Sequence, residues 1–307
     1  MSSEHSADVF HHVRDNTVFE VPQFLGGEWH IPQPFGESFA ITKFMVLEVV
    51  AALLVFFIFR TLASKIANGE PVRGRFWNFW ESIALYLRDE VVRPTIGDGH
   101  AEHDGHDGHS GHGTGAGSDH VGHGPQSHGK YSHSADKFLP FIWSTFFFIL
   151  ICNLLGAIPW MGSPTGHIWV TGVLAVSTLF VVLRAGMSQL GFLGFWKSLV
   201  PHMDIPAWLA IFIVPMIWVL EFIGLMIKHG VLAVRLFANI MAGHTVIAVI
   251  LGFIMDVSHS PLYYAVAPAS VLGQVGVGLL ELFVAFLQAY VFVFLATVFI
   301  GSATHPH

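Results

Sequence analysis

Long apolar runs separated by shorter polar connections occupy the chain from residue 38 onward. The runs are rich in Leu, Ile, Val and Phe, and several reach the ~20 residues that a helix needs to cross a bilayer. They are continuous rather than alternating every second residue, so they predict membrane helices and not the strands of a barrel. The composition agrees, since 53% of residues are hydrophobic and 11% charged, against ~25% charged in soluble domains. The predicted class is an all-α integral membrane protein.

The polarity pattern divides the chain into five segments: 1–37, 38–64, 65–97, 98–136 and 137–307. The first is polar, and its prolines (Pro22, Pro32 and Pro34) are expected to break any regular element. The second contains the first membrane helix, from about Phe39 to Ala63. The third begins with basic residues and continues into an amphipathic stretch, 76–93, whose aromatic residues predict a helix lying at the membrane surface.

The last segment is expected to hold the rest of the membrane domain. Further spans are predicted at about 138–160 and 168–188, followed by apolar blocks at 207–255 and 262–301. Each block is too long for one perpendicular crossing. It is either broken into a pair of spans or forms one steeply tilted or bent helix, and the apolar pattern leaves both open.

The distribution of Lys and Arg predicts the orientation of the chain in the membrane. Six of these residues lie from Arg60 to Arg93, whereas the 159–167 and 256–261 connections have none. By the positive-inside rule the N-terminus is outside and the 60–137 connection is inside. If each final block crosses once, the C-terminus is cytoplasmic. The chain has no basic patch of the kind that would indicate nucleic-acid binding.

A His- and Gly-rich tract fills residues 98–136. It lacks the apolar residues needed to fold, so it is expected to be disordered. Weak, non-essential metal binding or filler, and a regulated metal or pH sensor, remain alternative interpretations. The candidate weak ligands recur every three residues: His100, His103, His106, His109 and His112.

This tract supports one alternative function, a zinc-type metal-ion transporter with a His-rich cytoplasmic loop. Such a transporter needs ligands inside the membrane, typically a His with a carboxylate one helical turn away. None of the apolar blocks has that spacing, which occurs only in the tract itself. The alternative therefore loses most of its support.

The final blocks carry isolated ionisable groups in very apolar surroundings. Between residues 205 and 255 these groups are Glu221, Lys228, His229, Arg235 and His244. An Arg at the centre of a membrane helix costs ~2.5–3.5 kcal/mol on insertion scales, so its charge is expected to serve a function. Because arginine does not lose its proton, it acts only as a fixed positive charge.

Helical spacing predicts two polar stripes. The first contains Glu221, Lys228 and Arg235, which are seven residues apart, with Asn239 one turn further on and His244 on roughly the opposite face. The second contains Glu281 and Gln288. Such groups either pair with one another across helices, as Arg235 with Glu281 or Lys228 with Glu221, or form an ion path. Glu221, His244 and Glu281 can each take up and release a proton, whereas Arg235 cannot.

The run RLFANIMAGH (235–244), followed by LELFVAFLQAYVF (280–292), resembles subunit a of the rotary ATP synthase membrane sector. NLLGAIPW (153–160) and PTG (164–166) are also similar to that family, and the similarity covers roughly residues 38–302 without the His-rich tract. His229 departs from the family pattern, since many members have Pro there. The resemblance implies about five membrane-embedded helices plus one interfacial helix, with the last two long, tilted and curved around a ring of c subunits.

The resemblance also implies a role for each polar residue. Arg235 matches the indispensable arginine facing the proton-carrying ring, and Asn239 and Gln288 match its polar neighbours. Glu221 matches an acid of one aqueous half-channel, and His244 and Glu281 match a coupled pair in the other.

The function implied is a non-catalytic, proton-conducting stator subunit in a bacterial plasma (inner) membrane. Its implied partners are the c-ring proteolipid, the peripheral-stalk b subunits and the rest of the ATP synthase. No cofactor or nucleotide-binding Gly-rich loop is evident, and no internal repeat suggests a secondary transporter.

Overall fold

Five long apolar helices dominate the computed structural model, which describes residues 18–20, 28–33, 41–67, 74–96, 134–158, 161–200 and 206–304. Each is long and apolar enough to cross a membrane. They are α1 (Lys43–Ala67), α4 (Leu139–Gly156), α5 (Ile168–Leu190), α7 (Ala207–Asp256) and α8 (Tyr263–Thr304). The predicted all-α membrane class and the number of long helices are confirmed.

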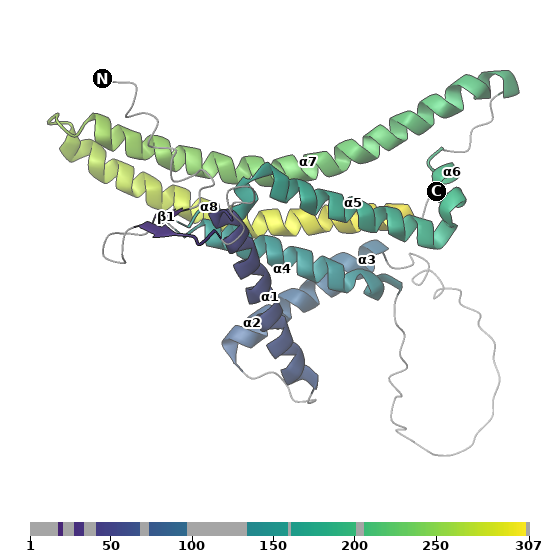
Figure 1. Ribbon diagram of the computed structural model, residues 1–307, viewed down its shortest axis with the longest axis horizontal. Helices are drawn as coiled ribbons and strands as arrows, with labels where there is room; N and C mark the ends of the chain where they lie inside the picture. Colours follow the sequence, from purple (N-terminus) through teal and green to yellow (C-terminus); the bar gives the residue numbers. More distant parts are fainter. Residues whose placement is uncertain are drawn as a thin grey trace, which may run out of the picture.

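The two final blocks are single helices and not pairs of spans. α7 has 50 residues and α8 has 42, which at ~1.5 Å per residue gives ~75 Å and ~63 Å. A hydrocarbon core of ~30 Å holds such helices only at a steep tilt. Both run unbroken past an internal proline, Pro215 in α7 and Pro268 in α8. Figure 1 shows α7 as a long bowed helix along one edge of the molecule, with α8 beside it.

The helices pack in layers, with α5 and α8 between α7 and α4, and with α1 against the far side of α4. α4 is apolar on all sides and is the most enclosed span, with 56% of its most apolar window buried. Its Phe146, Phe147 and Leu150 meet Phe292 of α8 in the main core. The corresponding window of α7 has no buried residues, so much of α7 is left uncovered by the described parts of the chain.

The stretch 76–93, predicted as an amphipathic helix at the membrane surface, is helical and packs along this core. The helical segment comprises α2 (Arg75–Tyr86), a π-helical turn η4 (Leu87–Val92) and α3 (Arg93–Ile96). One face buries Trp80 and Leu87, while Phe76 and Phe79 stay exposed. The π turn was not predicted. Within it the N–H of Arg93 donates to the carbonyl of Arg88, five residues back.

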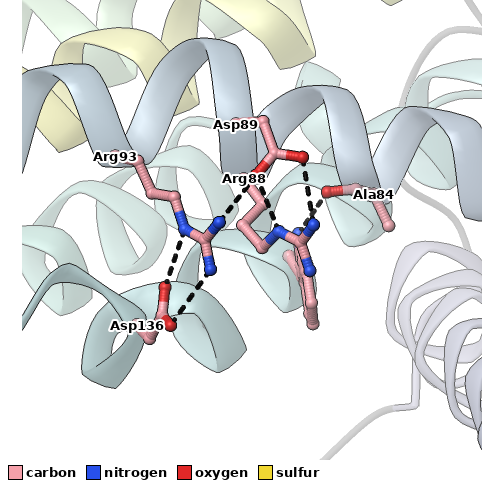
Figure 2. Close-up of polar contacts among 6 residues, drawn as sticks. Ala84, Arg88, Asp89, Arg93 and Asp136 are labelled. Atoms are coloured by element: carbon pink, nitrogen blue, oxygen red, sulfur yellow. Dashed lines mark hydrogen bonds and ion pairs between the residues drawn. The ribbon is translucent and has the colours of Figure 1, made fainter. Parts of the chain in front are cut away.

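Ion pairs fasten this segment to the start of α4, as Figure 2 shows. Arg93 bonds Asp89 at 3.1 Å and Asp136 at 3.3 Å, and Asp136 lies in the short helix η5 (Ser134–Phe138). Arg88 also donates to Asp89, which lowers the pKa of that carboxyl and keeps it ionised. The indole N–H of Trp143 donates to the Ala84 carbonyl at 3.0 Å. Residues 93 and 136, which flank the His-rich tract, are therefore held together.

We expected the prolines to break any regular element in residues 1–37. That expectation was wrong, because six of these residues form two short strands. β1 (Val18–Glu20) and β2 (Glu28–His30) form an antiparallel pair in which Phe19 is opposite Trp29. Pro22 and Pro32 fall outside the paired residues, so the ladder loses no N–H donor. Most of the tract at 98–136 lies outside the described residues, and its last three residues, 134–136, belong to η5.

Candidate functional site

The guanidinium of Arg235 lies at the edge between the packed and uncovered faces of α7. Leu232 and Leu236 on the packed face are each 1% exposed, whereas Val231 and Val234 are 56% and 55% exposed. Nη2 of Arg235 is buried and has no hydrogen-bond partner among the described residues. The hypothetical Arg235–Glu281 ion pair is likewise absent from the described part of the chain. Arg235 is thus a half-buried cation with one enclosed, unpaired nitrogen, beside a surface that the described chain does not cover.

Contacts along the antiparallel α7–α8 pair define its register. A methyl group built at Gly273 would lie 3.8 Å from Cδ1 of Ile250, and one built at Gly243 would lie 3.0 Å from Oε1 of Glu281. The second contact pairs Gly243 of α7 with Glu281 of α8. Eight residues further along each helix, the corresponding positions are Arg235 and Ala289. A register kept over this stretch would bring Gln288, which is 8% exposed, level with Arg235.

The same register brings the predicted acid and histidine together. The Glu281 carboxylate packs against Gly243, the residue before His244. His244 is half-buried, and its Nε2 atom is buried without a hydrogen-bond partner among the described residues. In the described structure, the buried Nε2 atom of His244 makes no hydrogen bond to Glu281.

A buried hydrogen-bond chain lies beside this pair and was not predicted. Thr165 donates to Oδ1 of Asn153 at 2.7 Å, and Asn153 donates to the carbonyl of Ala285 at 3.3 Å. Ala285 is one turn from Glu281 on α8. Ser163 bonds Thr165 at 2.7 Å, and Gly156 has no side chain where Ser163 approaches it. The chain therefore joins α4 and η6 (Pro164–Gly166) to α8 at Glu281.

Two further polar residues belong to this end of the site. Lys43, the first residue of α1, is only 4% exposed and interacts electrostatically with His244. Gln274 has a buried Nε2 atom with no partner among the described residues. It is seven residues before Glu281, so it continues the stripe of Glu281 and Gln288. That spacing could have identified Gln274, whereas nothing in the apolar pattern indicated that Lys43 is buried.

The other end of α7 has a more open arrangement. Glu221 and Lys228 are 4.0 Å apart, and each side chain is 54% exposed. They line a cavity of about 140 Å³ together with the hydroxyl-bearing residues Ser198 and Ser302. The Lys228–Glu221 pair, the structural alternative to an ion path, is present only as a long, exposed contact. Such pairs contribute little to stability, so structural pairing does not account for these groups.

The predicted residues do not form one cluster. Glu221 is more than 30 Å along α7 from His244, at ~1.5 Å per residue. Asn239 is half-buried one turn beyond Arg235. The five histidines proposed as weak metal ligands lie outside the described residues. Within the described ranges no cluster of His, Cys, Asp or Glu could hold a metal ion.

These features define a multi-pass membrane protein whose ionisable groups lie along two long tilted helices. The family model described as ATP synthase A chain matches residues 125–301. ATP synthase subunit a 2 of Chlorobaculum tepidum is 33% identical over 302 residues, covering 96% of this chain and 72% of that protein. ATP synthase subunit a of Myxococcus xanthus is 32% identical over 313 residues, covering 94% and 87%. The chain therefore belongs to the ATP synthase subunit a family, a component of the ion-transporting membrane sector.

Proposed function

We propose that this chain conducts protons between two half-channels that meet only at a carboxylate carried by a rotating partner ring. The observation that carries the proposal is the placement of Arg235. It is a permanently charged group with a buried, unsatisfied nitrogen in the described structure, at the margin of an uncovered helix face. A partner carboxylate brought to this face would satisfy the guanidinium.

The uncovered face of α7 suits a close-packed helical partner. Ala238 and Ala242 are exposed beside Val231 and Val234. Small residues at a membrane interface let helix backbones approach closely. The proposed occupant is the ring of c-subunit proteolipids, whose helices would slide past Arg235.

One half-channel is proposed at the His244 end of the site. His244 and Glu281 are both side chains that can take up and release a proton, and Glu281 lies against Gly243, the residue before His244. A proton entering at this end would pass through both groups in turn. Gln288 would be level with Arg235, and Asn239 is one turn from it, so these two would orient the partner carboxylate or water at the end of this path.

The second half-channel is proposed at the Glu221 end. The cavity beside Glu221 and Lys228 has two hydroxyl-bearing residues and exposed charged groups, which favours hydration. By the positive-inside rule this end faces the cytoplasm. That orientation places the N-terminus outside and the C-terminus inside a bacterial plasma membrane.

Arg235 would both drive rotation and prevent leak. A protonated rotor carboxylate is neutral and tolerates lipid, whereas an ionised one does not. Arg235 stabilises the ionised form, so the ring releases its proton there. Since the guanidinium does not give up its own proton, it cannot pass protons between the half-channels. Each proton crossing contributes ~2.3 kcal/mol per 100 mV.

The chain would therefore act as a non-catalytic stator. ATP formation would occur on other subunits of the complex, and the peripheral-stalk b subunits would hold this chain against the ring's torque. Co-purification tests the partnership directly. The assembled sector should contain a small, two-helix, oligomeric proteolipid.

Substituting Arg235→Ala in the assembled complex tests the central role. We expect proton-driven ATP synthesis in energised vesicles to be lost, while an ATP-independent proton leak appears. Arg184→Ala is the control, because Arg184 is an exposed arginine on α5 away from the polar stripes. The proposal fails if the Arg235→Ala complex assembles and synthesises ATP at the wild-type rate.

A further inference from the structure

A groove of about 730 Å³ lies between α1 and α4, on the opposite side of the core from α7. This volume is in the range of sites that hold organic ligands. α1 contributes residues four and five positions apart, including Val55, Phe56, Phe59 and Arg60, so a single face of the helix forms one wall. The groove contains none of the residues proposed to move protons.

Most of the groove is apolar. Val55, Phe56 and Phe59 line the α1 side, and the Phe59 ring packs on Phe147 of α4 with centroids 4.5 Å apart. Trp143 lines the α4 side, and its indole N–H is already used by the Ala84 carbonyl. The tryptophan therefore presents apolar ring surface to the groove. These walls suit a hydrocarbon chain.

One end of the groove is polar and positively charged. Arg60 is exposed there, and no carboxylate among the described residues pairs with it. Ser64 lies one turn further along α1, and Ser144 lies on the facing helix. The guanidinium supplies several N–H donors in a planar fork that matches phosphate geometry. The Ser64 hydroxyl supplies one further donor, whereas the Ser144 hydroxyl already donates to the Phe141 carbonyl at 2.9 Å.

The charged end is at the depth where lipid headgroups begin. Arg60 is 17 residues after Lys43, the first residue of α1, which is ~25 Å along the helix. In a hydrocarbon core of ~30 Å, a helix that starts at one face brings Arg60 close to the other. Lys65, on the following turn, adds a second positive charge at that boundary. The apolar walls extend from Arg60 back toward the membrane centre.

We propose that this groove binds an anionic phospholipid. Its phosphate would be held by Arg60 and Ser64, and an acyl chain would lie along Val55, Phe56 and Phe59. Basic pockets between membrane helices on the cytoplasmic side recognise anionic headgroups. A partner's apolar helix in the same groove would instead cover the Arg60 charge without neutralising it, at a desolvation cost.

Photo-crosslinking in the assembled membrane sector tests this proposal. The complex is reconstituted in vesicles containing phosphatidylglycerol or phosphatidylcholine with a diazirine on the acyl chain. Crosslinked peptides from α1 and α4 are then quantified by mass spectrometry. We expect phosphatidylglycerol to label the groove at least about fivefold more than phosphatidylcholine. This ratio corresponds to the ~1 kcal/mol by which one basic residue at the membrane surface favours an anionic lipid.

Arg60→Gln should remove this preference while leaving assembly intact. Arg184→Gln, at an exposed arginine outside the groove, should preserve it. Equal labelling by both lipids, or a preference unchanged in Arg60→Gln, would overturn the proposal. A peptide of another subunit crosslinked in the groove, with no lipid adduct, would also overturn it and identify a protein as the occupant.

Discussion

Glu221 and His244 lie on the same helix, yet their surroundings differ in the two properties that govern proton movement. Glu221 is 54% exposed, opposite Lys228 and beside a cavity with two hydroxyl-bearing residues. His244 is half-buried, with Nε2 enclosed, and follows Gly243, against which the Glu281 carboxylate packs. Under the proposed function, water would supply alternative proton carriers at the Glu221 end. At the His244 end the proton would depend on a few side chains in fixed positions.

The largest expected difference comes from removing the acid at each end. Glu281→Gln should lower proton flux by about 100-fold, the lower range for losing a positioned acid–base group. Glu221→Gln should lower it by less than about tenfold, because water in the cavity keeps an alternative route open. Proton uptake by vesicles after a pH jump measures both. A Glu221→Gln loss as large as that of Glu281→Gln would remove the distinction between the two ends.

A smaller effect is expected from moving the Glu281 carboxylate without removing it. A methyl at Gly243 would lie 3.0 Å from Oε1 of Glu281, so Gly243→Ala forces that flexible side chain to shift. Displacing a reacting group by a fraction of an ångström is expected to cost about tenfold in flux. Gly252→Ala on the same helix is the matched control, because no atom approaches within 4 Å of the added methyl. Equal fluxes in the two variants would mean that the position of Glu281 is not critical.

Breaking the buried chain beside Glu281 should act on stability first. Asn153→Ala leaves the Thr165 hydroxyl and the Ala285 carbonyl without their shared partner. Thr165 keeps its hydrogen bond to Ser163, so the loss is that of two buried hydrogen bonds, about 0.5–1.5 kcal/mol each, and the thermal midpoint of the assembled sector should fall. Ser177→Ala is a milder control, because that hydroxyl bonds only a carbonyl of its own helix. A thermal midpoint equal to that of Ser177→Ala would show that the chain contributes little.

The smallest effect is expected far from both ends. Deleting residues 100–133 should leave coupling largely intact, since Arg93 and Asp136 already hold the flanking elements together at 3.3 Å. The ratio of ATP synthesised to proton-motive force in vesicles is the measurement. Loss of synthesis in a normally assembled complex would give the His-rich tract a role in coupling.

The sequence predicted what depends on spacing and missed what depends on packing. Seven-residue intervals placed Glu281 and Gln288 on one stripe, and the structure extends that stripe to Gln274. Apolar block length alone did not decide between one tilted helix and two spans, because Pro215 and Pro268 are compatible with either. The network of Asn153, Thr165 and Ala285 joins residues up to 132 positions apart. Such long-range contacts leave no local pattern, and the burial of Lys43 likewise arises from the packing of α1.

Passive proton conductance of the assembled sector, with ATP synthesis inhibited, tests the separation of the two half-channels by Arg235 most directly. Arg235→Ala should open a leak, and adding Glu281→Gln to that variant should close most of it, because the leaking proton must pass the His244 end. A leak that the second substitution leaves unchanged, or no leak from Arg235→Ala in an intact complex, would contradict the account.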